Sequence, residues 1–179
     1  MMRIKQQLHN IIGLLGVGLL CCITPLQGAE QEMVTHGRCS MQFPGDIERI
    51  SEMMPMEGED FGLQYDAYIS SLDTKTVFML LVAEYPEFVD EQFARMNLEA
   101  FLNVILTYNP NNQLLFADIV LIQGHEALDF FIRSGTMYFK GRALMVNNQL
   151  YLMAMECLIQ DYDEANYTKF VESFQLTKS

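Results

Sequence analysis

The run TMYFKGRALMVNNQLYLMAMECL, residues 136–158, decides the fold. Two apolar extended segments lie on either side of Asn147-Asn148. Asn tolerates positive φ better than most residues, so this pair is a suitable two-residue hairpin turn. In the second segment both alternating sets of side chains are apolar until Glu156. That pattern predicts a strand near the centre of a sheet, covered on both faces.

Further strands precede this hairpin, and short turns separate them. Val77 to Val82 is a continuously apolar run. Turn-forming residues 71–75 precede it, so a second hairpin is expected there. Short turns between sequential strands imply an antiparallel sheet. The expected strands are Cys39–Phe43, Phe61–Ser70, Thr76–Tyr85, Leu114–Ile122, Ala127–Arg133, Thr136–Val146 and Gln149–Leu158.

Two amphipathic helices are expected. Asp90 can cap a helix over residues 90–108, and Asp161 opens a second helix with Glu164 in the capping-box position. The expected apolar faces are Phe93, Met96, Ala100, Val104 and Tyr108 in the first helix, and Tyr167, Phe170, Val171 and Phe174 in the second. Both faces must be buried against the sheet. The predicted fold class is therefore α+β, an antiparallel sheet of about six to seven strands packed with two main helices.

The N-terminus has the three parts of a secretory signal peptide. Arg3 and Lys5 form a basic start, the uncharged run 11–24 follows, and Gly28 and Ala29 are small exit residues. The run is shorter than the ~20 apolar residues of a bilayer-spanning helix. The alternatives are an uncleaved anchor and a lipid anchor at Cys21 or Cys22. The predicted organisation is a signal peptide over 1–29, a flexible entry segment over 30–38 and a folded domain over 39–179.

Export changes the charge that partners would meet. Arg3 and Lys5 leave with the signal peptide, so 9 of 11 basic residues remain against 23 acidic ones, a net charge of −14. Nucleic acids and anionic membranes are themselves polyanions, so both are disfavoured as partners. The expected location is the periplasm, with secretion or a lipid anchor as alternatives. The expected partner is another envelope protein, and no membrane span is expected after signal cleavage.

Two cysteines, Cys39 and Cys157, remain after cleavage. An even pair in an oxidising compartment favours a disulfide. Two buried thiols are the alternative, because the sequence gives no distance between the two residues.

Catalytic chemistry has little support in the sequence. The chain contains no G-x-S-x-G motif, and His36 and His125 lie in a predicted entry segment and a predicted turn. The acidic stretch 46–60 lacks the regular spacing of a calcium loop. We therefore predict no catalytic residue, no resident metal and no cofactor.

The stretch 46–60 is also rich in methionine, and it is expected to form a loop with at most one helical turn. Thioethers suit Cu(I), which makes a soft-metal site formed by Met53, Met54 and Met56, or including Met41, one hypothesis. Flexible methionines also make adaptable contact surfaces. The predicted partner-contact residues are Ile47, Ile50, Met53, Met54 and Met56.

Several short motifs resemble the PsbP-like (PsbP/Mog-type) family, especially its small exported bacterial members of unknown function. The similarity covers about residues 38–177. The motifs are Phe43-Pro44-Gly45, Ala83-Glu84-Tyr85-Pro86, Gly124-His125-Glu126-Ala127, Gly141-Arg142, Leu150-Tyr151 and the helix end Phe170–Leu176.

This resemblance implies an antiparallel sheet of about seven strands between helices, an α/β/α sandwich. Known members are mostly binding or assembly modules, including an extrinsic subunit of photosystem II and a partner of a nuclear GTPase. We therefore expect a non-enzymatic binding or assembly module of the cell envelope. A small-ligand or soft-metal binding protein is the second hypothesis, and an unrecognised hydrolase is the third.

Overall fold

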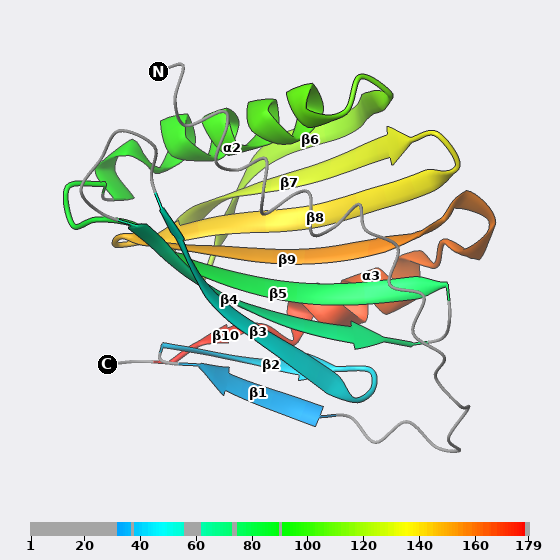
Figure 1. The fold of residues 1–179 in the computed structure, drawn as a ribbon, viewed down its shortest axis with the longest axis horizontal. Helices are drawn as coiled ribbons and strands as arrows, with labels where there is room; N and C mark the ends of the chain where they lie inside the picture. The colour runs from blue at the N-terminus through cyan, green and yellow to red at the C-terminus, as the bar shows by residue number, and fades with distance from the viewer. Residues whose placement is uncertain (1–31, 37, 56–61, 73–74, 90, 178–179) are drawn as a thin grey trace.

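The computed structural model describes residues 32–36, 38–55, 62–72, 75–89 and 91–177. Its main sheet has seven antiparallel strands in the order β3-β4-β5-β9-β8-β7-β6, and a small sheet has the order β1-β2-β10 (Figure 1). The strands are β1 (Glu32–His36), β2 (Cys39–Phe43), β3 (Ile47–Pro55), β4 (Gly62–Ser71), β5 (Thr76–Glu84), β6 (Asn112–Ile122), β7 (His125–Ser134), β8 (Met137–Val146), β9 (Gln149–Leu158) and β10 (Gln175–Leu176). The helices are α2 (Ala94–Tyr108) and α3 (Glu164–Glu172), each preceded by a short 3-10 helix, η1 (Glu91–Phe93) and η2 (Ile159–Asp161). The predicted α+β class is confirmed.

The most apolar strands lie in the middle of the sheet, as their sequences predict. β5 pairs with β9 from Thr76 opposite Cys157 to Glu84 opposite Gln149. Both strands are buried along most of their length. The hairpin between β8 and β9 turns at Asn147, which has a φ of 52°. The turn residue therefore uses the positive φ that Asn tolerates.

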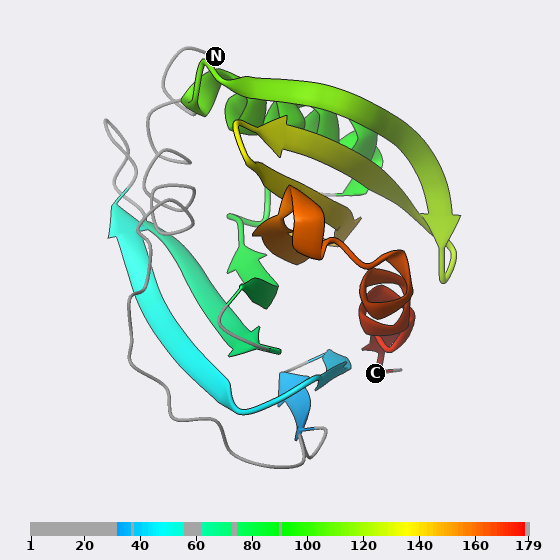
Figure 2. The same cartoon turned by 90° about the vertical axis from the view of Figure 1, so that its right-hand side faces the viewer.

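Each face of the sheet has its own hydrophobic core. One core contains α2 residues such as Leu98 and Phe101, with Leu152 from β9. The other contains α3 residues such as Phe170, with Met153 from β9 and the strand β2. The two helices therefore cover opposite faces (Figure 2), and the α/β/α sandwich is confirmed. Neither described helix is long and apolar enough to cross a membrane.

The prediction of a loop over residues 46–60 is wrong for residues 47–55. They form β3, which pairs with β4 from Ile47 opposite Ser70 to Pro55 opposite Gly62. The run of acidic, Met and Pro residues has weak strand propensity, but pairing with a strong neighbouring strand overrides propensity. Likewise, the predicted flexible segment 30–38 contains β1, which pairs with β2.

Two details of the predicted helices are also wrong. Among the residues predicted for the buried face of α2, Val104 is buried, whereas Phe93 and Met96 are exposed. The face that packs on the sheet contains Leu98, Phe101, Leu102 and Ile105 at the same helical spacing. In α3 the cap is Asp163, not Asp161, and its side chain accepts from the Ala165 amide.

Candidate functional site

Strand β6 is an edge of the main sheet, and large apolar side chains are exposed along it. Among the described strands it pairs with β7 alone, so its outward backbone groups have no partner strand there. The exposed fractions are 44% for Leu114, 49% for Leu115, 51% for Phe116 and 74% for Leu121. Several large apolar side chains exposed on one strand mark a contact site more often than a single exposed residue does.

The opposite edge, β3, is built differently. It carries Glu48, Arg49 and Glu52, and it ends at Pro55. Charged side chains and proline are common means of keeping an edge strand from pairing with another chain. In contrast, β6 has a single charged residue, Asp118, and no proline. Of the two edges, β6 is the one suited to contact with another molecule.

A β-bulge shapes the exposed part of β6. The register with β7 shifts between Leu114, which lies opposite Ile132, and Phe116, which lies opposite Phe131. Leu115 is therefore the extra residue. A bulge bends its strand and changes the direction of nearby side chains. This bulge lies within a stretch, Gln113 to Asp118, in which every side chain is exposed, so both faces of β6 are open there.

Contacts at both ends hold β6 in place. At its start, the Asn112 side-chain amide donates to the Ile105 carbonyl of α2 at 2.8 Å. Just after its end, the Gln123 side chain donates to the Phe174 carbonyl at 3.0 Å and accepts from the Leu176 amide at 2.9 Å. Because these hydrogen bonds already order β6, binding of a partner would not incur the conformational-entropy cost of ordering the strand.

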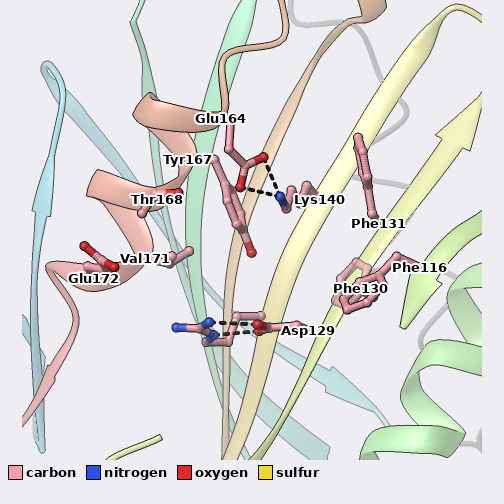
Figure 3. A pocket seen from close by; sticks show the side chains of 11 residues that line it. Phe116, Asp129, Phe130, Phe131, Lys140, Glu164, Tyr167, Thr168, Val171 and Glu172 are labelled. Atoms are coloured by element: carbon pink, nitrogen blue, oxygen red, sulfur yellow. Dashed lines mark hydrogen bonds and ion pairs between the residues drawn. The ribbon is translucent and has the colours of Figure 1, made fainter. Parts of the chain in front are cut away.

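A hollow of about 240 Å³ opens beside β6, on the face covered by α3. Phe116 and Phe131 line it from β6 and β7, and Tyr167 and Glu172 line it from α3. Figure 3 shows the α3 side chains facing those of the strands across this space. The hollow therefore continues the apolar edge of β6 inward, toward a charged floor.

The floor of the hollow contains two ion pairs. Arg142 of β8 binds both carboxylate oxygens of Asp129, with distances of 2.6 and 2.7 Å. The side-chain hydrogen bond to Asp129 raises the pKa of Arg142 above its ordinary value. Lys140 binds both oxygens of Glu164, at 2.7 and 2.6 Å. Each cation in the hollow is thus already neutralised from within the chain (Figure 3).

Aromatic rings surround the Lys140 ammonium. Its Nζ lies 4.6 Å from the ring centre of Tyr167 and 5.3 Å from that of Phe131. Tyr162 stacks on Phe131 and donates a hydrogen bond to Glu164. Burial would raise the pKa of Glu164, but hydrogen bonds from Lys140 and Tyr162 outweigh burial, so the net pKa is lowered. Burial is the main cause that raises the pKa of Tyr167, and the negative charge of Asp129 adds to it. The Tyr167 hydroxyl therefore stays protonated.

The ion pairs and the aromatic rings around them define the surface beside β6. Charged groups that are paired and held by rings fix the shape of a surface and give it specificity. Within the described residues, no group of three His, Cys, Asp or Glu side chains is arranged to hold a metal ion.

The structure separates the residues predicted to form a contact patch. Ile47 packs against the α3-side core and Ile50 against the α2-side core, because side chains alternate along β3. One helical turn does not present them together, and that part of the prediction is wrong. Met53 is 68% exposed on β3. The side chains of Met54 and Met56 lie outside the described residues.

The other predicted residues are distributed as follows. Cys39 and Cys157 are both buried in the α3-side core, and the disulfide between them stays a prediction. Met41 is buried in the same core, whereas Met53 is exposed. His125 lies 3.3 Å from a Glu91 carboxylate oxygen. The His36 side chain lies outside the described residues.

Sequence reasoning missed the β6 surface although it predicted the strand. The signal available was the run Leu114-Leu115-Phe116, which breaks the alternation of a strand with one wet face. What the sequence lacks is the strand order. Only that order puts β6 at an edge and leaves the run exposed.

Comparison with solved structures bears on the fold. The protein is similar to the solution structure of cyanobacterial PsbP (CyanoP) from Synechocystis, with a TM-score of 0.54, 10% identity, and coverage of 88% of this chain and 98% of that one. The chain has a PsbP-like fold. The resemblance read from its motifs is confirmed at that level. No protein-family model and no curated protein matches the sequence.

Two other solved structures match at lower similarity. A crystal structure from Bacteroides thetaiotaomicron has a TM-score of 0.46 and 10% identity, covering 84% of this chain and 49% of that one. A Pseudomonas aeruginosa protein of unknown function, described as a putative regulator, has a TM-score of 0.41 and 13% identity, covering 75% and 86%. No functional residue is carried over from any of these structures.

Proposed function

We propose that the protein is a non-enzymatic binding module of the cell envelope, and that its protein partner docks on β6. The observation that supports this is the exposed apolar edge of β6, which lacks the charges and proline found on β3. Burying exposed Leu and Phe side chains drives most protein association. The predicted signal peptide, residues 1–29, lies outside the described residues and is the basis for placing the module in the envelope.

The hollow favours a protein partner over a small molecule. Its volume of about 240 Å³ is below the ~300–1,000 Å³ of typical ligand pockets. Its two cations are bound by Asp129 and Glu164, so a small anion would have to displace a carboxylate. The small-ligand hypothesis therefore has weaker support than docking on the edge of β6.

Site-specific photocrosslinking in cells of the source organism tests this function. A photoreactive residue replaces Leu115 on β6, Met53 on β3 or Met96 on α2, one at a time. All three positions are exposed, so they differ in place rather than accessibility. We expect one discrete adduct with an envelope protein from position 115 and none from position 96.

The three positions also separate the hypotheses. An adduct from position 53 alone would support the contact patch predicted from the sequence and contradict docking on β6. The absence of an adduct at all three positions would contradict the binding-module function.

A further inference from the structure

We propose that β6 binds an extended segment of its partner as an eighth strand, and that this segment places a Lys or Arg side chain beside Asp118. The inference rests on the proposed function and adds the mode of binding and the chemistry of the partner.

The backbone of β6 is suited to strand addition. β6 pairs with β7 along nearly its whole length, from Asn112 opposite Ser134 to Ile122 opposite His125. Its other side faces no strand among the described residues. An added strand would bind the outward N–H and C=O groups, as in other complexes formed by β-strand addition. Since the existing strands fix the register of β6, the new strand would meet an ordered template.

The side chains of β6 would contact those of the added strand on both faces. Val120 packs in the α3-side core and Ile119 against the α2-side core, so β6 residues alternate between the faces. Phe116 and Asp118 share the α3 face with Val120. Neighbouring residues on paired strands share a face. The added strand would therefore meet a ring, a carboxylate and an aliphatic group in succession on that face.

Asp118 supplies the charge complementarity. It lies directly opposite Asp129 in the pairing of β6 with β7. Arg142 is bound to both oxygens of Asp129, and Lys140 is bound to Glu164. Asp118 has no ion pair with any described residue. Asp118, Asp129 and Arg142 thus lie in a row across β6, β7 and β8, and the one guanidinium in this row is bound to Asp129. The two carboxylates and one guanidinium leave a local negative charge at Asp118 for an incoming cation.

The same charges argue against a second copy of this chain as the occupant. A second β6 would bring a second Asp118 to the interface. It would also bring a further net charge of −14 for residues 30–179. Like charges across an interface oppose association. The occupant that fits is an extended segment of a different protein with a basic residue beside Asp118 on the α3 face and apolar residues beside Ile119 on the α2 face. Basic and apolar residues alternate along such a segment.

A synthetic peptide of alternating valine and lysine is the probe, added to the protein purified from its own cells. Its control has the same composition with all valines in one block and all lysines in another. We expect the alternating peptide to slow hydrogen exchange of the backbone amides in Asn112–Ile122, and the block peptide to have no such effect. Asp118→Asn should weaken the affinity about two- to five-fold. Glu99→Gln, on the exposed side of α2, should leave it unchanged.

Each other outcome overturns the inference. Equal binding of both peptides, or equal weakening by Asp118→Asn and Glu99→Gln, would mean general attraction to an acidic protein. Protection of β6 that depends on protein concentration without peptide would mean that a second copy is the occupant. If the alternating peptide fails while position 115 still crosslinks a partner in cells, strand addition is wrong and the binding function stands.

Discussion

Gly141 shows how one residue sets the packing next to the hollow. It lies on β8 directly opposite Phe130, and a Cβ at this position would be 2.5 Å from the ring of Phe130. That ring packs in turn against Phe101 and Phe139. The absence of a side chain at 141 thus lets an aromatic ring lie flat over the strand.

Gly141→Ala should destabilise the fold by about 1–3 kcal/mol, because the buried ring has no space into which to move. Urea denaturation of the purified protein measures this change. In a Phe130→Leu background the added cost of Gly141→Ala should shrink, since the atoms that clash are gone. An unchanged unfolding midpoint for Gly141→Ala alone would contradict this account of the packing.

Glu156 makes stability depend on pH. It lies on β9 between Val77 and Phe139, and burial raises the pKa of its carboxyl from 4.5 to about 7. The folded chain therefore holds this proton more tightly than the unfolded chain. The contribution to stability is fully present below pH 4.5 and is lost as the pH rises to about 7.

Glu156→Gln should remove this dependence. The variant should match the wild type at about pH 5 and be more stable by roughly 2–3 kcal/mol at about pH 8, since each pKa unit is worth about 1.4 kcal/mol. Urea denaturation at both values measures the difference, with Glu99→Gln as the exposed control. If the free energy of unfolding changed equally with pH in the wild type and in Glu156→Gln, the raised pKa of Glu156 would be contradicted.

At the scale of elements, α3 forms one side of the hollow, and a single side chain caps the N-terminus of this helix. The Asp163 side chain accepts from the Ala165 amide at 2.8 Å and from the Asn166 side chain at 3.1 Å. The neighbouring Asp161 lies in η2 instead and is 3.6 Å from the Lys75 ammonium. The two aspartates thus form a matched pair in which one caps and the other does not.

Asp163→Ala should cost about 1 kcal/mol of stability, because the first turn of α3 loses its side-chain acceptor. Asp161→Ala should cost less. Thermal or urea unfolding of the two variants, measured side by side, gives the comparison. A larger loss for Asp161→Ala would mean that the helix is capped as the sequence first suggested.

The elements also show what can be predicted from a sequence. β5 and β9 are apolar on both alternating sets of residues, so their central place follows directly from burial. β3 was missed because Met, acidic residues and Pro do not favour a strand, and its pairing with β4 decides its structure. The α3 cap was misplaced because Asp161 and Asp163 both fit the local pattern.

At the scale of the whole molecule, the candidate site depends on strand order. In a strand with a neighbouring strand on each side, Leu114 and Phe116 would be ordinary core residues. They are exposed because β6 is last in the order of the sheet. A site that tertiary topology creates was therefore beyond prediction from local patterns.

The net charge of residues 30–179, the part that the predicted signal cleavage would leave, bears on how such an edge stays available. Residues 30–179 carry a net charge of −14. Repulsion between copies keeps an acidic protein soluble, while a basic partner would be attracted. The structure thus combines a local surface that favours contact with a global charge that restricts which molecules make it.

One measurement tests the central claim, that β6 is the surface through which this protein binds its partner. Wild type, Leu115→Lys and Met96→Lys chains are expressed in cells of the source organism, crosslinked with formaldehyde and compared for recovery of the partner. Both variants place a lysine at an exposed apolar position, so they match in charge and in loss of apolar area. We expect Leu115→Lys to lose the partner and Met96→Lys to retain it; retention by both, with equal yield of folded protein, would contradict the claim.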